Sequence, residues 1–160
     1  MSDITPKNYV VYRAATPIVV DGHLNDGPWK AAPWTDLFVD IEGDAKPLPR
    51  FATRVMMLWD DDYFYFAADM EEPHVWGTLT KRDSVICNDN DFEIFIDPDG
   101  DGEHYMEFEM NPLNAAWDLY LPKAYSKGGT ADHDWDFEGI KHPVQIDGTR
   151  SEEHTSELQS

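Results

Sequence analysis

An alternation of apolar and polar side chains within residues 89–111 is the strongest constraint that this sequence places on its fold. The apolar set lies at every second position on both sides of an acidic turn: Phe92, Ile94, Ile96, Met106, Phe108 and Met110. The positions between them carry mainly acids and an amide: Asp91, Glu93, Phe95, Glu107, Glu109 and Asn111. Because successive side chains of a β-strand point to opposite faces, this period of two predicts a hairpin. We expect one face to build a core and the other to present oxygen acceptors.

The rest of the chain is typical of further short strands separated by turns. Residues 53–59 and 63–70 alternate in the same way and are joined by three consecutive Asp residues, which suit a tight turn. Residues 37–41 and 115–121 are two more predicted strands. Helix signals are almost absent. The sequence therefore predicts an all-β fold, an antiparallel β-sandwich of the immunoglobulin-like or jelly-roll-like kind.

The charge of the chain limits its partners. It has 32 acidic and 12 basic residues and a formal net charge of -20. Nucleic acids and anionic membranes both require a positive surface, so we expect neither as a partner. An aromatic content of 13% argues against an acidic disordered tail. Acidic and aromatic residues together favour cations, or neutral polar ligands with apolar faces such as sugars.

Length and the two ends of the sequence set further expectations. A chain of 160 residues suits one domain. No apolar run approaches the ~20 residues that span a bilayer, and the first residues lack the basic and apolar regions of a secretory signal. Residues 150–160 resemble the in-frame translation of a common sequencing adapter. We therefore expect a domain at 1–149 that lacks its C-terminal strands, a non-native tail at 150–160, and a monomer when the domain is complete.

Four blocks, in their order along the chain, resemble the carbohydrate-binding modules of family 9 and the wider family 9-like group. They are residues 17–22, 55–65, 89–97 and 105–111, with Trp29 after the first. The resemblance implies a β-sandwich that binds sugars without cleaving them, often in secreted or periplasmic proteins that degrade plant polysaccharide. It also implies structural calcium. Cys87 stands where the family carries a sugar-clamping Trp; from its residue type we expect it to be a small buried hydrophobe.

Three residues of the predicted hairpin are candidates for sugar contacts. Glu93 and Asn111 match family positions that contact sugar hydroxyls, and Glu109 stands where the family example has a basic residue. A carboxylate can accept hydrogen bonds from two vicinal hydroxyls, and such charge-assisted bonds are strong. The alternative is an ordinary solvated strand face, which antiparallel sheets often have.

The long connection over residues 71–88 supplies three further candidates for sugar contacts. Trp76, beside His74, could stack its ring on a sugar and so replace the missing Trp at position 87. Arg82 could donate hydrogen bonds to sugar oxygens. The alternatives are a Trp that anchors the loop and charged side chains that are merely solvated.

Acidic residues between the two hairpin strands predict a calcium site. Carboxylates alternate with other residues at Asp97, Asp99 and Asp101, followed by Glu103, and glycines allow a tight wrap. Calcium prefers such hard oxygen ligands. The alternative is a turn without a metal, because Asp and Gly are common turn residues.

Three other functions are alternatives to sugar binding. Glycoside hydrolysis needs a carboxylic acid and a base in different environments, and the sequence marks none of Glu93, Glu107 and Glu109 as either, so we expect no catalysis. A haem-binding redox domain would take its ligands from a set of Met and His residues: Met70, Met110, His74 and His104. An acidic protein-interaction module would bind basic partners with strong salt dependence.

Overall fold

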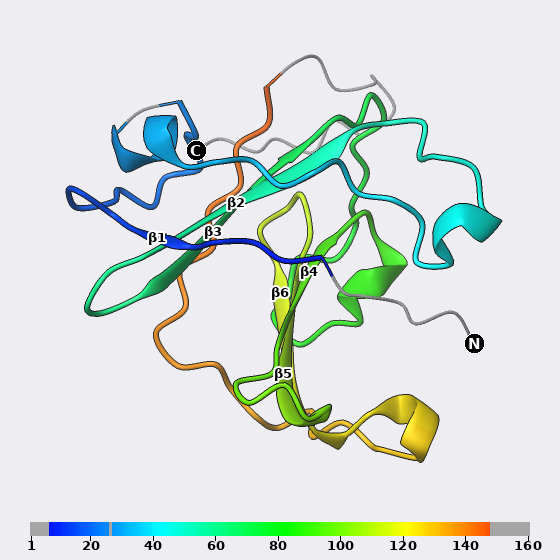
Figure 1. Ribbon diagram of the computed structural model, residues 1–160. Helices are drawn as coiled ribbons and strands as arrows, with labels where there is room; N and C mark the ends of the chain where they lie inside the picture. The colour runs from blue at the N-terminus through cyan, green and yellow to red at the C-terminus, as the bar shows by residue number, and fades with distance from the viewer. Residues whose placement is uncertain (1–6, 26, 148–160) are drawn as a thin grey trace. The chain divides into compact units, whose positions relative to one another are not determined.

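The computed structural model describes residues 7–25 and 27–147 (Figure 1), and the chain divides into two compact units at Glu72 and Pro73. Each unit contains one three-stranded sheet. Helical segments in the described ranges are 3-10 turns of five residues or fewer. The predicted adapter-derived tail at 150–160 lies outside the described residues.

The first unit contains the sheet β1-β2-β3. Strand β1 (Tyr12–Arg13) runs parallel to β2 (Thr53–Trp59), which pairs antiparallel with β3 (Phe64–Met70). The predicted turn between β2 and β3 is confirmed. The Asp60 carboxylate accepts hydrogen bonds from the backbone N–H groups of Asp62 and Tyr63, at 2.9 and 2.8 Å.

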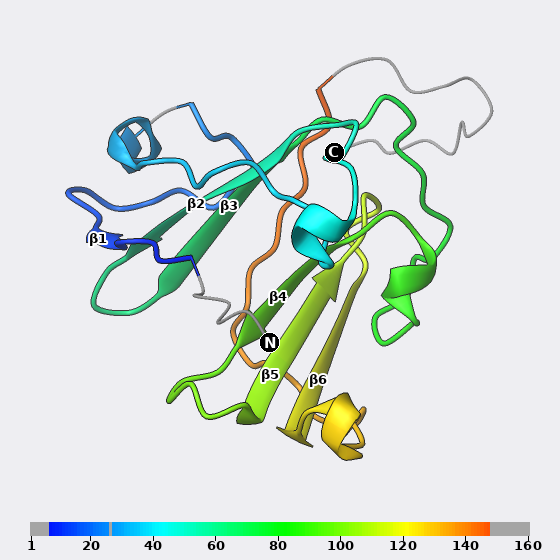
Figure 2. The same cartoon turned by 45° about the vertical axis from the view of Figure 1, so that its right-hand side comes forward.

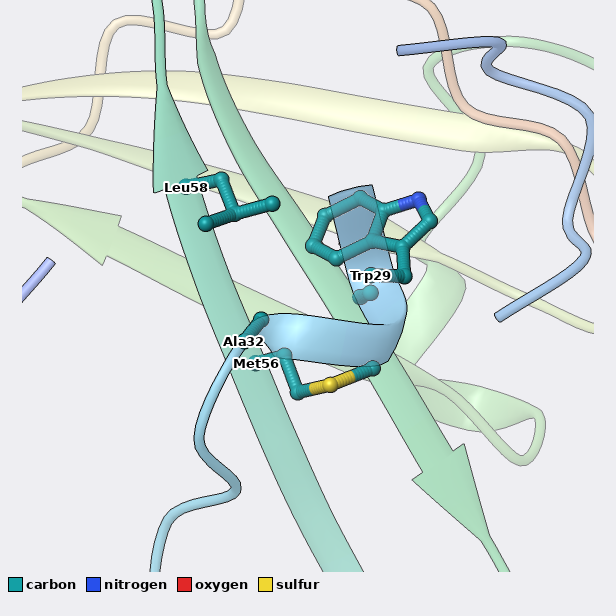
Figure 3. Packing of buried hydrophobic residues seen from close by; sticks show 5 residues of the cluster. Trp29, Ala32, Met56 and Leu58 are labelled. Carbon is teal, nitrogen blue, oxygen red and sulfur yellow. The ribbon is translucent and has the colours of Figure 1, made fainter. Parts of the chain in front are cut away.

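The core of the first unit forms where a short helix covers this sheet. Trp29 lies on η1 (Gly27–Ala31), and its ring faces Leu58 and Met56 of β2 (Figure 3). Ala32 and Ala67 complete the buried cluster. Trp29 is the largest side chain of this cluster.

The strand predicted at residues 37–41 does not form. Among the described residues, this part of the chain is joined to β2 by two backbone hydrogen bonds, from Thr35 N–H to Val55 O and from Phe38 N–H to Thr53 O, both at 2.9 Å. After them the chain turns through η2 (Gly43–Ala45). The prediction of a strand at residues 37–41 was therefore wrong.

The second unit contains three neighbouring antiparallel strands, β4 (Phe92–Ile96), β5 (Glu103–Met110) and β6 (Ala116–Lys123) (Figure 2). Glu93 lies opposite Glu109, which lies opposite Trp117. The neighbouring row of the sheet contains Ile94, Phe108 and Asp118 and points to the other face. Two 3-10 turns flank the sheet, η3 (Ile86–Asn88) and η4 (Tyr125–Lys127).

The structure corrects the prediction that the acid-bearing face of the hairpin takes no part in a core. The buried cluster of this unit contains Trp117, Leu119 and Leu121 of β6. These residues share a face with the acids, since Trp117 pairs with Glu109 and Leu119 pairs with Glu107. Glu107 and Glu109 of the hairpin are therefore buried, because they lie beside the buried apolar side chains of β6.

These elements confirm the predicted all-β class. Two mainly antiparallel sheets, linked by turns, are consistent with a β-sandwich. In the part of the chain that the structure describes, no helix has the length and apolar character needed to cross a membrane. The domain limits at 1–149, the missing C-terminal strands and the monomeric state stay predictions.

Candidate functional site

Four acidic side chains gather on one face of the second sheet, and we call them the carboxylate cluster: Asp91, Glu93, Glu107 and Glu109. One carboxylate oxygen from each of Asp91, Glu93 and Glu109 lies within 4.8 Å of the others. Glu93 is exposed, whereas Glu109 is 2% and Glu107 6% exposed. Register explains this convergence, because β4 and β5 place Glu93 and Glu109 directly opposite each other.

The carboxylate cluster holds protons more tightly than isolated acids do. Burial raises the pKa of Glu109 to about 8, and the negative charges of Glu93 and Glu107 add to the rise. Burial also raises the pKa of Asp91 to about 6, with a contribution from Glu93. The pKa values of Glu93 and Glu107 are raised as well, chiefly by burial. Like charges in a poorly solvated place disfavour full ionisation, so part of the cluster stays protonated at neutral pH.

Few hydrogen-bond donors serve these acids. The Cys87 backbone N–H on η3 donates to Glu109 Oε2 at 2.9 Å. Asp91 Oδ2 and Glu107 Oε2 are buried and have no hydrogen-bond partner within the described part of the chain. Cys87 itself is exposed, so the expectation that it is a buried hydrophobe was wrong. Its backbone, rather than its side chain, fixes a member of the cluster.

Aromatic rings border the carboxylate cluster. Phe95 pairs with Glu107 across the hairpin and is 52% exposed. Its ring centroid lies 6.3 Å from that of Tyr105. Tyr125 on η4 is 53% exposed. Burial of its hydroxyl and the nearby charge of Glu107 raise the pKa of Tyr125, which places this hydroxyl beside the acids.

Neither ring was predicted from the sequence as a site residue. Phe95 could have been predicted, because it lies on the face of its strand that carries the acids. An apolar side chain on that face does not belong to the predicted core. Tyr125 could not have been predicted in this way, because it lies on η4 outside the strands and no local pattern places it beside the sheet.

Asn111 fills a different role from the predicted one. It is 1% exposed, and its Nδ2 donates to Leu79 O and to Asp89 Oδ2, both at 2.8 Å. Its Oδ1 accepts from the backbone N–H groups of Leu113 and Ala115, at 3.1 and 2.9 Å. The amide therefore ties the long loop to the end of β5, and its buried bonds leave no polar atom to present to a ligand.

Arg82 is also occupied by protein partners. Its Nη2 donates to both carboxylate oxygens of Asp118, at 2.6 and 2.8 Å, and to Asp136 Oδ1 at 3.1 Å. Asp118 is fully buried and lies on the opposite face of the sheet from Glu93 and Glu109. The structure therefore does not bring Arg82 together with the other predicted sugar-binding residues.

Trp76 and His74 lie exposed in the long loop. The Trp76 backbone is fixed at both of its polar groups: its N–H donates to Asn90 Oδ1 at 3.2 Å, and its carbonyl accepts from the Asn90 N–H at 3.3 Å. Asn90 lies two residues before β4. Trp76 is thus held close to the beginning of the strand that carries Glu93.

The predicted calcium ligands form a tight acidic turn. One oxygen from each of Asp97, Asp99 and Asp101 lies within 4.8 Å of the others; Glu103 is outside that group. The Asp97 carboxylate accepts from the N–H groups of Gly102 and Gly100, at 2.8 and 2.9 Å. These bonds, that of Gly102 first, lower the pKa of Asp97. Such bonds explain the turn without a metal, and calcium at this loop stays a prediction.

An all-β domain that combines carboxylates with exposed rings on one sheet face has the composition of a carbohydrate-binding module. The chain belongs to the carbohydrate family 9 binding domain-like family, whose sequence model matches residues 20–136. This match confirms the resemblance drawn from the sequence blocks. No curated protein and no solved structure matches the chain significantly.

Proposed function

We propose that this domain binds oligo- or polysaccharide on the face of the second sheet that carries Glu93, Phe95 and Tyr125. The observation that carries the proposal is that Phe95 is exposed on the same sheet face as the acids. The chain also belongs to a family of carbohydrate-binding domains. An aromatic ring flanked by acceptors matches a sugar, which has apolar C–H faces and hydroxyl edges.

Each part of the proposed site has one task. The Phe95 and Tyr125 rings would cover a sugar face, and removing such apolar area from water drives binding. Glu93 is the exposed carboxylate of the cluster and would accept hydrogen bonds from sugar hydroxyls. Trp76 and His74 would extend the site at the beginning of β4.

Two of the residues predicted from the sequence to contact sugar are not part of the proposed site. Asn111 supports the site by holding the loop, and Arg82 supports it by neutralising buried Asp118. Glu109 is buried and would act on the sugar only through its neighbour Glu93.

The expected ligand is a plant-type glucan or xylan, and the domain would serve proteins that hydrolyse such polymers. The structure distinguishes buried Glu109 from exposed Glu93, which the sequence analysis did not anticipate. We nevertheless propose binding without cleavage, because the family is one of binding modules.

Affinity electrophoresis tests this function directly. The 160-residue chain is run in native gels that contain soluble β-glucan, xylan or mannan, beside a Glu93→Ala variant and a gel without polysaccharide. Retardation of the wild type by one polymer, reduced in the variant and without release of reducing ends, supports the proposal. Equal mobility in every gel, for protein with a folded circular dichroism spectrum, contradicts it.

A further inference from the structure

The carboxylate cluster lies across the junction of two strands. Glu93 of β4 is paired with Glu109 of β5, and oxygens of these two residues and of Asp91 lie within 4.8 Å of one another. Glu107 lies on the same face of β5 as Glu109 and is paired with Phe95. In the described part of the chain, β4 pairs with β5 alone, so it forms an edge of its sheet. Any repulsion among these acids therefore acts directly on the pairing of an edge strand.

Protons shared between the acids explain how the interior tolerates them. Glu109 is 2% and Glu107 6% exposed, which leaves little water to solvate two charges. Glu107 is hydrogen-bonded to Glu109, and Asp91 is hydrogen-bonded to Glu93. Two carboxyl groups can form such a bond only if one of them is protonated, because a carboxylate has no hydrogen to donate. The acid-to-acid hydrogen bonds therefore require that the cluster keeps protons.

The surroundings of the carboxylate cluster provide little that could replace these protons. The titratable groups that act on it are Cys87 on η3, Tyr105 on β5, Tyr125 on η4 and Asp89 before β4. None of these four side chains can carry a positive charge. A neutral donor, the Cys87 backbone N–H, serves Glu109 at 2.9 Å. Loss of the protons would thus leave like charges facing one another, which destabilises a strand pair.

We propose that the carboxylate cluster is a proton-controlled switch on the pairing of β4 with β5. While the cluster holds its protons, the acid-to-acid hydrogen bonds keep β4 closed on β5. When rising pH removes them, repulsion among the carboxylates opens this edge strand. Glu93 and Phe95 both lie on β4, so opening would also remove the sugar-binding face; this consequence rests on the function proposed above.

The protons leave the cluster over a definite range of pH. Burial raises the pKa of Glu109 to about 8 and that of Asp91 to about 6. In an unfolded chain, the pKa values of Glu and Asp are both about 4. The folded state therefore binds these protons more tightly. The stability that they provide is complete below about pH 4 and is lost as the pH rises through about 6 to 8. The switch is thus closed in mildly acidic solution and open in mildly alkaline solution.

Hydrogen exchange of the 160-residue chain, measured by mass spectrometry near pH 5 and near pH 9, tests the proposal. Each rate is divided by the intrinsic rate at the same pH, so that the ratio reports strand opening. Glu109→Gln and Asp91→Asn are compared with the wild type, because an amide has the size of the protonated acid and donates a hydrogen bond but cannot become an anion. Glu138→Gln, at an exposed acid of the same unit, is the matched control. Peptides from β2, in the first unit, are the internal reference.

We expect the protection of β4 in the wild type and in Glu138→Gln to fall by at least about tenfold between the two pH values, while that of β2 is preserved. Glu109→Gln should reduce this fall to less than about threefold. Constant protection of β4 in the wild type would overturn the proposal, as would an equal fall in β2 or an undiminished fall in folded Glu109→Gln. Asp91→Asn decides the matter by the same criterion if Glu109→Gln does not fold.

Affinity electrophoresis of the wild type at the same two pH values separates the switch from the proposed function. Retardation by polysaccharide at the acidic pH that is lost at the alkaline pH supports the consequence for sugar binding. Equal retardation at both pH values, with β4 open at the alkaline one, would overturn that consequence. Retardation at neither pH contradicts the proposed function alone, since the exchange of β4 is measured without sugar and decides the switch by itself.

Discussion

Glu93 and Glu109 face each other directly across the β4–β5 pair, yet Glu93 is exposed and Glu109 is buried. The difference arises from the neighbours of each residue. Strand β4 lies at the edge of its sheet, whereas β5 is central and is covered by β6 and by the Cys87 backbone. This pair of opposite residues therefore supplies an exposed acceptor, Glu93, and a buried acid, Glu109, whose pKa is raised to about 8.

Replacing Asn111 with Ala should destabilise the second unit. The change leaves the Leu79 carbonyl and the N–H groups of Leu113 and Ala115 without their buried partner. We expect a loss of roughly 2–4 kcal/mol in the free energy of unfolding, measured by urea denaturation. Gln145→Ala, at an exposed amide, is the control and should change stability by less than about 0.5 kcal/mol. A similar effect of both changes would contradict the role given to Asn111.

Replacing Arg82 with Ala should also destabilise this unit, because it leaves buried Asp118 without its cation. Truncating one partner of a fully buried ion pair costs about 3–5 kcal/mol. Arg82 is partly exposed, so we expect roughly 2–4 kcal/mol. Lys7→Ala breaks the exposed pair between Lys7 and Asp36 and should cost about 0–1 kcal/mol. Denaturation of both variants in parallel checks the difference, which a small effect at Arg82 would refute.

Tyr65 should make the first unit sensitive to alkali. Its hydroxyl donates to Asp60 Oδ2 at 2.7 Å, and burial, followed by this hydrogen bond, raises the pKa of Tyr65 to about 12. A tyrosine in the unfolded chain titrates near 10. The folded state thus holds this proton more tightly, and the resulting stability is present below about pH 10 and lost as the pH rises through about 12.

Unfolding measured at pH 9 and at pH 11.5 checks this dependence. Tyr65→Phe should lower stability at pH 9 and weaken the fall in stability between the two values. Tyr12→Phe, at an exposed position of β1, is the control and should follow the wild type. An undiminished fall in Tyr65→Phe would show that another group is responsible.

The sequence was sufficient to predict β2 to β6 and which hairpin side chains share a face, but not which of the two faces would be buried. Period-two alternation located β2 to β6 because it depends only on neighbouring residues. The choice of core face depended on the pairing of β6 with β5, which sets Leu119 beside Glu107. That contact joins residues far apart in the chain, so a hairpin pattern read by itself could not reveal it.

The candidate site was only partly predictable for the same reason. Glu93 and Trp76 are exposed, as the sequence predicted, and their contact with a sugar stays a prediction. Asn111 seemed available because its register matches that of Glu109, but its loop partner Leu79 lies 32 residues away. Tyr125 reaches the sheet through η4, which no local pattern indicates.

Calorimetric titration of Phe95→Ala with the polysaccharide that retards the wild type is the most direct test of the sugar-binding face. Fully burying a Phe side chain contributes about 1.5–3 kcal/mol, which corresponds to roughly a tenfold or greater loss of affinity. Phe64→Ala is the matched control, since Phe64 is an equally exposed ring on the sheet of the first unit. The account predicts weakened binding in Phe95→Ala and unchanged binding in Phe64→Ala. Wild-type affinity in a folded Phe95→Ala protein would contradict it.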